Sequence, residues 1–208
     1  RTEISDQGIL SISSKDPLNE HGWVVHVKAR IAPSDAPCLS RLDLSVFSSD
    51  DEKIEASHLY ERVAKLGLCY KGAFRALQKA CDLGHSYIVK VESKDPVADE
   101  GMKLSPALVD GILQGLFFLL KEEDNTAHAY LPTTFGNVQI WRFGRPSYGV
   151  VRLVKCSEFS LVADFEIYDQ AGEVLASLKE VRFRRVRHGK REMLLRRKMV
   201  SIISISIR

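Results

Sequence analysis

The sequence has few of the residues from which metal sites and disulfide frameworks are built. Its four cysteines, Cys38, Cys69, Cys81 and Cys156, lie far apart and form no C-x-x-C pair. Zinc sites and small disulfide-stapled folds both depend on closer cysteine spacing. We therefore expect no bound metal, and the cysteine usage favours a reducing compartment, the cytoplasm.

Long apolar runs and a strong charge of one sign are also absent. The longest apolar run, 111–120, is interrupted by Gln114 and is too short to span a bilayer, and the N-terminal residues have no signal-peptide character. Lys and Arg number 30 against 27 Asp and Glu, for a net charge of +3. We therefore expect neither a membrane nor a nucleic acid as partner. The basic stretch at 182–198 is typical of a solvated strand face and tail.

What the chain does contain is one segment, 105–120, that is too apolar for a surface. Ser105 can cap a helix and Pro106 suits its first position, so the segment predicts one buried helix. After Pro106 its only polar residues are Asp110 and Gln114, which lie four apart and so share a helix face. Buried polar groups cost free energy unless they are hydrogen-bonded or used. Asp110 and Gln114 are therefore candidate functional residues, although they could instead satisfy backbone groups.

Strand patterns are found on both sides of this helix. A hairpin is expected from 8–15 and 23–31, and a short helix from 58–66 that ends at Gly67. One long apolar helix followed by consecutive antiparallel strands is typical of an α+β hot-dog fold, in which a curved sheet wraps the helix. The further strands are expected around 78–82, 86–92, 129–131, 137–143, 148–157, 160–168 and 173–186.

Two motifs around the helix resemble those of the dehydratase domains of polyketide synthases, which are double hot dogs. Residues 66–75 resemble the G-x-x-Y-G-P-x-F segment, with Gly67, Tyr70 and Phe74 in place. Residues 105–114 resemble the H-P-A-L-L-D-x-x-x-Q motif, with Asp110 and Gln114 in place. The chain departs from these motifs at Lys71, Gly72 and Ser105, where Gly, Pro and His are usual.

Two shorter stretches extend the resemblance to about residues 4–187. Residues 131–140 resemble the L-P strand entry after the helix, and 23–26 resemble the W-x-x-H strand that closes the first hot dog. The resemblance implies an α+β hot-dog fold that is mainly the second half of a double hot dog. It divides the chain into a closing hairpin of a first hot dog (1–32), a linker (33–55), a second hot dog (56–188) and a basic and apolar tail (189–208), for which we have no role.

The resemblance also implies roles for individual residues. Asp110 would be the acid that helps the β-hydroxyl leave, or the group that orients it, with Gln114 as its support. Tyr70 would donate a hydrogen bond in the same cavity, although it could equally be a core tyrosine. The remaining candidate substrate contacts are Phe74, Gly111, Gly115 and Pro132. Gly111 and Gly115 would leave room for a slender acyl or pantetheine chain, or would only let the helix pack closely on the sheet.

The histidine base of the family is missing from the sequence. That base lies in an H-x-x-x-G-x-x-x-x-P motif of the first hot dog, and none of the six histidines here has glycine four residues later. Either the base lies on sequence outside these 208 residues, or the domain has lost it. We expect these residues alone not to complete a dehydration.

Three functions therefore remain in view. The leading one is a polyketide synthase dehydratase acting on a β-hydroxyacyl chain, which the phosphopantetheine of an acyl carrier protein carries. It needs no cofactor, and its expected partners are that carrier protein, docked at 182–198, neighbouring synthase domains and a second copy of the chain as a homodimer. The second is a non-catalytic dehydratase-like scaffold or docking module. The third is a single hot-dog thioesterase or hydratase, which would need a dimer to complete its site.

Overall fold

The computed structural model describes residues 1–15, 22–33, 41–47, 53–95, 99–120, 128–187 and 201–207. In this part of the chain the helices are α1 (Ala56–Lys65), α2 (Pro106–Gln114) and the 3₁₀ helices η1 (Ser45–Phe47), η2 (Gly72–Phe74) and η3 (Gly115–Leu119). The strands are β1 (Thr2–Ile4), β2 (Ile9–Ser14), β3 (Val24–Pro33), β4 (Lys53–Glu55), β5 (Leu77–Asp82), β6 (Ser86–Val91), β7 (His128–Ile140), β8 (Tyr148–Cys156), β9 (Ser160–Tyr168), β10 (Val174–Arg187) and β11 (Ser201–Ile207).

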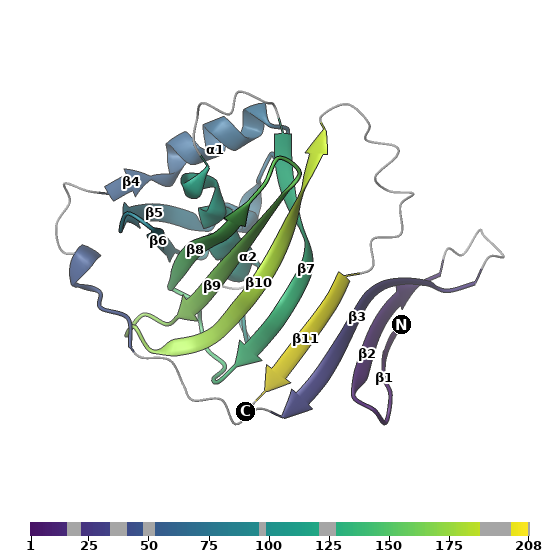
Figure 1. Cartoon of the computed structure of the whole chain (residues 1–208). Coiled ribbons are helices and arrows are strands. Elements are labelled where there is room, and N and C mark those ends of the chain that lie inside the picture. The colour runs from purple at the N-terminus through teal and green to yellow at the C-terminus, as the bar shows by residue number, and fades with distance from the viewer. Residues whose placement is uncertain are drawn as a thin grey trace.

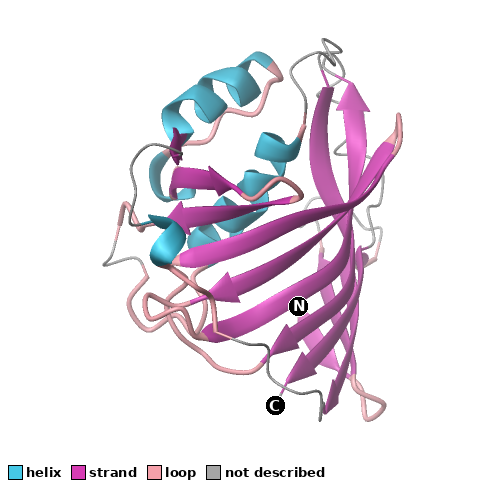
Figure 2. Cartoon of the chain, turned by 60° about the vertical axis from the view of Figure 1, so that its left-hand side comes forward, coloured by secondary structure: helices cyan, strands magenta, loops and turns pink. Residues whose placement is uncertain are grey.

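All of these strands belong to one curved sheet that wraps around α2 (Figures 1 and 2). Their order across the sheet is β1-β2-β3-β11-β7-β10-β9-β8-β6-β5-β4. Neighbours pair antiparallel except at β11, which runs parallel to both β3 and β7. Helix α1 lies on the same side of the sheet as α2 and contacts β5 (Figure 1). The predicted arrangement of a curved sheet around a buried helix is confirmed.

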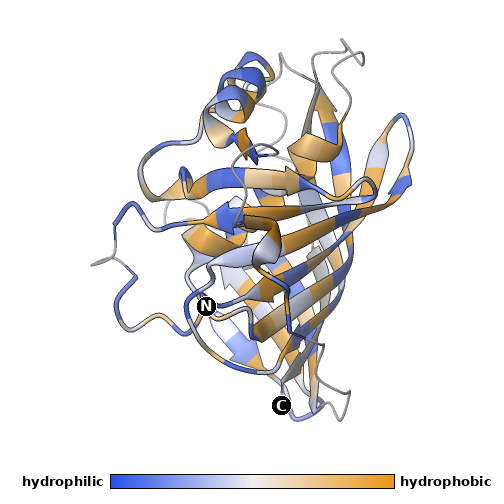
Figure 3. Cartoon of the chain, turned by 90° about the vertical axis from the view of Figure 1, so that its left-hand side faces the viewer, coloured by the Kyte–Doolittle hydropathy of each residue, from blue (hydrophilic) through white to orange (hydrophobic). Residues whose placement is uncertain are grey.

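The main core lies between α2 and the inner face of the sheet. Leu108, Ile112 and Leu116 on the helix side are fully buried against residues such as Val89 and Val151. Hydrophobic and hydrophilic residues are interspersed along the strands (Figure 3). Strand side chains alternate between faces, so a second, smaller cluster forms on the outer face. There Leu42, Val46 and Phe47 of the segment 41–47 pack onto the strands. The strand residues of this cluster are Ile88, Val150, Tyr168 and Val174, and Trp141 and Tyr148 pack beside them.

The predicted buried helix at 105–120 is confirmed at its start and wrong at its end. The Ser105 hydroxyl accepts a hydrogen bond from Leu108 N at 3.4 Å, and Pro106 is the first helical residue. The α-helix ends at Gln114, and Gly115–Leu119 continues as a 3₁₀ helix. Helices often tighten in this way in their last turn. Hydrophobicity predicts that the segment is buried, but it cannot distinguish the two kinds of helix.

Helix α1 ends as its glycine predicts. Gly67 has φ 84°, and the amides of Gly67 and Leu68 donate to the carbonyl groups of Ala64 and Val63 at 2.9 Å and 3.0 Å. This is the Schellman arrangement, in which a glycine in the left-handed region closes the last turn. The helix begins at Ala56, two residues before the expected start.

The expectation of two separate strands at 129–131 and 137–143 is wrong, because β7 runs without a break through 128–140. Pro132 interrupts the sequence pattern but not the strand. Pro132 pairs with Phe183 and Thr134 with Arg182, so Thr133 is an extra residue in a β-bulge. A proline is tolerated at a bulge because the ladder hydrogen bond is already missing there.

The two ends of the chain meet in the same sheet. The predicted hairpin of β2 and β3 is confirmed as an antiparallel pair, while its turn at 16–21 lies outside the described residues. In the tail, which alternates like a strand from 193 onward, Ser201–Ile207 forms β11 between β3 and β7. Of the expected linker, 34–40 and 48–52 lie outside the described residues, and Lys53–Glu55 forms the edge strand β4. The division into parts of two hot dogs stays a prediction.

Candidate active site

Asp110 and Gln114 contact each other one turn apart on α2. Gln114 Nε2 donates to Asp110 Oδ2 at 2.7 Å and to the carbonyl oxygen of Phe74 at 3.0 Å. The Gln114 side chain is almost completely buried, with the residue 2% exposed, and Asp110 is half-buried. The prediction that these residues share a helix face is confirmed. The amide ties the carboxyl of α2 to the η2 turn.

Tyr60 of α1 completes this group of residues and was not among the predicted site residues. Its hydroxyl donates to Gln114 Oε1 at 3.0 Å and accepts a hydrogen bond from Leu77 N at 3.1 Å. Tyr60 lies beside buried Leu59 and Val63 on the apolar face of a short helix. A tyrosine on such a face is expected in the core, so its only signal is that a buried phenol needs a polar partner.

Tyr70 lies next to this group. Its ring meets the Tyr60 ring edge-on, with centroids 6.1 Å apart. The Arg75 guanidinium lies over the Tyr60 phenol ring, with Cζ 4.6 Å from the centroid. The structure therefore brings together Asp110, Gln114 and Tyr70 of the predicted site residues, and adds Tyr60 and Arg75.

Burial controls the protonation of this group. Desolvation raises the pKa of Asp110, and the hydrogen bond from Gln114 opposes part of that rise. Desolvation likewise raises the pKa of Tyr60 to about 12. The pKa of Tyr70 rises through burial and, next, through the nearby Asp110 charge. Asp110 has no cation among the causes of its shift, so it is a carboxyl that takes up a proton more readily than an ordinary aspartate.

Gly111 and Gly115 lie on the side of α2 that faces the sheet. A Cβ added at Gly111 would lie 3.1 Å from Ala76 Cβ, and one at Gly115 would lie 2.8 Å from Val89 Cγ1. Both contacts are tighter than normal van der Waals packing. The two glycines thus allow the close approach of helix and sheet, which is the packing interpretation left open above. Room for a substrate chain beside them stays a prediction.

The other two candidate substrate contacts have different positions. The Phe74 ring is exposed, and the residue reaches the site through its carbonyl group. Pro132 lies half-buried in β7 opposite Phe183 of β10 and is not part of the hydrogen-bonded group. Between Tyr70 and Phe74, Gly72 has φ 56°, a conformation that the family's usual proline cannot adopt. The backbone conformation of the η2 turn therefore requires that Gly72 replace the proline that is usual in the family.

Another carboxyl, Glu166 of β9, is buried in the sheet. It accepts hydrogen bonds from Arg152 at 2.8 Å, Tyr168 at 2.9 Å and Lys179 at 3.2 Å. Desolvation would raise the pKa of Glu166, but the hydrogen bonds from Arg152 and Tyr168 and the charges of Arg152 and Lys179 outweigh it and lower the pKa. The network around Glu166 thus favours its ionised form, whereas the surroundings of Asp110 favour the protonated form.

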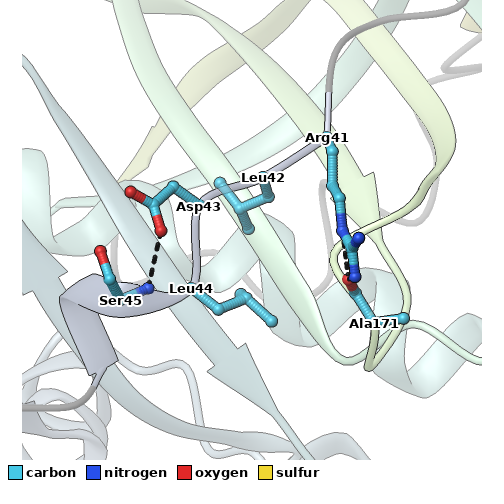
Figure 4. Close-up of a pocket in the computed structure, with 6 residues that line it drawn as sticks. All are labelled: Arg41, Leu42, Asp43, Leu44, Ser45 and Ala171. Carbon is cyan, nitrogen blue, oxygen red and sulfur yellow. Dashed lines mark hydrogen bonds between the residues drawn. The ribbon is translucent and has the colours of Figure 1, made fainter.

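Surface pockets are found at two places in the part of the chain that the structure describes. One, of about 340 Å³, is bounded by the start of α1, by η2 and by β5, and includes Tyr60, Arg75 and Lys94. The other, of about 510 Å³, lies between residues 41–45 and Ala171 (Figure 4). In it Arg41 already donates to the Ala171 carbonyl oxygen at 2.7 Å and pairs with Glu173. The first pocket touches the hydrogen-bonded group through Tyr60. The second contains Asp43 and Ser45, but the Asp43 carboxylate already accepts a hydrogen bond from Ser45 N at 2.9 Å, and none of its lining residues belongs to the group around Asp110.

Neither a cluster of metal ligands nor a helix able to cross a membrane is found among the described residues. Within them, no three His, Cys, Asp or Glu side chains gather as a metal site would require. Over the same residues, no helix combines the length and the apolar character needed to cross a membrane.

Known proteins are similar to this chain in sequence and in fold. The family model described as "Polyketide synthase dehydratase N-terminal domain" matches residues 45–193. A relative from Streptomyces orinoci, the spectinabilin polyketide synthase system protein NorA', is 31% identical over 108 residues, which are 50% of this chain and 3% of that protein. The chain therefore spans only a small part of that relative. The family description names an N-terminal part, whereas the motifs assign 56–188 to the second hot dog, and this assignment stays a prediction.

Solved structures show the same fold. A trans-AT polyketide synthase dehydratase domain from Brevibacillus brevis has a TM-score of 0.67 at 21% identity, over 89% of this chain and 68% of that one. An inactive histidine-to-phenylalanine mutant of the CurJ dehydratase has a TM-score of 0.61 at 16% identity, over 88% of this chain and 66% of that one. The predicted α+β hot-dog class is confirmed.

Proposed function

The chain belongs to the polyketide synthase dehydratase family, and from this membership we propose that it supplies the acid with which a dehydratase removes water from a β-hydroxyacyl chain. One observation carries the proposal. The Asp110 carboxyl is held by a neutral amide at 2.7 Å, and burial raises its pKa. A carboxyl in these surroundings can keep a proton to donate, as a general acid requires.

The reaction needs two groups that act on adjacent carbon atoms of the substrate. A base removes the acidic proton from C2, and the electrons of that C–H bond form the double bond between C2 and C3. The C3–O bond breaks, and Asp110 gives its proton to the departing hydroxyl, which leaves as water. Gln114 holds the carboxyl through Oδ2, and the half-buried Tyr70 phenol would donate a hydrogen bond to the substrate.

We propose that the base is a histidine outside the 208 residues. The histidines of this chain lack the family's H-x-x-x-G spacing. In the CurJ dehydratase, a histidine-to-phenylalanine mutant is described as inactive. A base on a preceding hot dog would face Asp110 across the substrate, so each hot dog would supply half of the acid–base pair.

The proposed substrate is carried by the phosphopantetheine of an acyl carrier protein. The thioester makes the C2 proton acidic and no electrons are transferred, so the proposal includes no cofactor. Arg182 and Arg184 are exposed on β10 and would attract the acidic surface of a carrier protein, while residues 188–198 of the basic stretch lie outside the described residues. Neighbouring synthase domains are further proposed partners, since the relative NorA' is a much longer synthase protein.

The alternative of a non-catalytic scaffold is supported by specific departures from the motifs. Ser105, where the family has histidine, hydrogen-bonds Asp99 and caps α2 at Leu108 N. Its hydroxyl thus has a structural role that needs no substrate. A single hot-dog thioesterase has less support, because β1, β2 and β3 extend the sheet beyond the unit that contains α2.

A dehydration assay distinguishes these functions. The protein to test is the full synthase polypeptide that contains this chain, with a β-hydroxyacyl pantetheine thioester as substrate. We expect wild type to dehydrate it and Asp110→Asn to lose about 10²- to 10⁴-fold in rate, the usual contribution of a general acid. An equal rate for Asp110→Asn would remove Asp110 from the mechanism. An inactive but folded wild type would support the scaffold.

A further inference from the structure

The orientation of the Gln114 amide is determined by two groups that each have a single hydrogen-bonding role. Leu77 N–H can only donate, so the Tyr60 oxygen accepts there at 3.1 Å and must direct its own hydrogen elsewhere. That hydrogen points to Gln114 at 3.0 Å, so the atom it meets must be the acceptor Oε1. The Phe74 carbonyl can only accept, so the atom that meets it must be Nε2.

These two constraints agree, and they extend to the carboxyl of Asp110. With Oε1 held by Tyr60, Nε2 is the atom that faces Asp110, and it donates to Oδ2 at 2.7 Å. An oxygen that accepts this N–H is the unprotonated oxygen of the carboxyl. The acid proton therefore belongs on Oδ1, which has no hydrogen-bond partner within the described part of the chain and is free to meet a substrate hydroxyl.

We propose that Tyr60 is a positioning residue that, together with the Phe74 carbonyl, fixes the Gln114 amide and so confines the proton of Asp110 to Oδ1. This inference rests on the proposed role of Asp110 as the acid. Tyr60 does not touch the carboxyl; it acts through Gln114. Its role requires the phenol to stay protonated and its ring to stay in one place.

The surroundings of Tyr60 meet both requirements. Burial raises the pKa of Tyr60 to about 12, so its hydroxyl remains a donor throughout the range in which Asp110 titrates. The ring packs against the Arg75 guanidinium, whose Cζ lies 4.6 Å from its centroid, and against the Tyr70 ring, whose centroid is 6.1 Å away. Arg75 is the cation and Asp110 the anion whose charges act on the Tyr60 phenol.

The test compares Tyr60→Phe with Tyr168→Phe in the full synthase polypeptide. Both variants delete one hydroxyl from a buried tyrosine, but the Tyr168 hydroxyl bonds Glu166, away from α2. Three quantities are measured in each variant: the dehydration kinetics, the pKa of the Asp110 carboxyl from its ¹³C NMR shift over pH, and the hydrogen exchange rate of the Gln114 side-chain amide. For Tyr60→Phe we expect kcat to fall about 10- to 100-fold with little change in KM, since misplaced catalytic groups lose rates of this order.

In the same variant the Gln114 amide should exchange faster, and the Asp110 pKa should rise because its donor is held less firmly. Tyr168→Phe should change none of these three readouts. The inference is overturned if Tyr60→Phe matches Tyr168→Phe in kinetics, titration and exchange. Failure of the proposed function gives a different result: Asp110→Asn would dehydrate as fast as wild type, while the NMR effects of Tyr60→Phe would persist.

Discussion

Asp110 on the helix is half-buried and Glu166 on the sheet is buried, and these two carboxyls lie in contrasting surroundings. Each has a tyrosine in its hydrogen-bonded group, but Glu166 also has two cations, Arg152 and Lys179. Asp110 has the neutral Gln114 instead. Burial raises the pKa of Asp110, whereas hydrogen bonds and cations lower that of Glu166 despite burial. The choice of partner, more than burial, decides whether a carboxyl is suited to donate a proton or to hold a structure together.

Removing a hydrogen-bond partner of each carboxyl should give the largest difference in dehydration rate between the two sites. We expect Gln114→Leu to lower the dehydration rate of the full polypeptide about 10- to 100-fold, because Asp110 loses its fixed position. Arg152→Leu, which removes a partner of Glu166, should leave the rate unchanged. Steady-state kinetics of both variants measure this difference. A similar loss in both would mean that the rate follows stability and not the position of Asp110.

Neutralising Glu166 tests the structural side of the comparison. We expect Glu166→Gln to lower the free energy of unfolding at neutral pH by about 1–3 kcal/mol, the usual range for hydrogen bonds to a charged group. The stabilisation by a carboxylate of lowered pKa is present above its unfolded pKa, and it is lost as pH falls through the folded pKa. Urea unfolding at neutral and at acid pH should therefore show the difference from wild type shrinking in acid. A constant difference would contradict the ionic network.

Neutralising Asp110 should change stability in the opposite direction and by less. The folded pKa of Asp110 lies above its unfolded value, so the folded state binds the proton more tightly. Stability of the wild type relative to Asp110→Asn should therefore fall as pH rises from the unfolded pKa through the folded one. We expect Asp110→Asn to unfold at equal or higher urea concentration than wild type at neutral pH. A clear loss of stability would indicate that ionised Asp110 is stabilised by a partner.

Much of this fold follows from local patterns in the sequence. The apolar segment beginning at Ser105, the glycine at position 67 and the strands β8, β9 and β10 were predicted from hydrophobicity and turn residues. The continuity of β7 was missed, because a bulge opposite β10 accommodates Pro132 and only the pairing reveals it. The parallel insertion of β11 between β3 and β7 joins distant parts of the chain, and no local pattern specifies such a partner.

The candidate site was predictable only along one helix. The spacing of Asp110 and Gln114 placed them on one face, and their hydrogen bond follows from it. Tyr60 and the Phe74 carbonyl come from other elements, and their contacts depend on how α1 and η2 pack against α2. Glu166 was also missed, since its partners Arg152 and Lys179 lie on the neighbouring strands β8 and β10, and a sequence alone does not give their register.

The central claim is that Asp110 is an acid and Glu166 a structural carboxylate, and one titration tests it. Carboxyl ¹³C shifts of both residues, assigned with Asp110→Asn and Glu166→Gln and followed over pH, give the two pKa values in one folded protein. The account predicts that Asp110 titrates above an ordinary aspartate and Glu166 below an ordinary glutamate. An Asp110 that titrates at or below the Glu166 midpoint would contradict it.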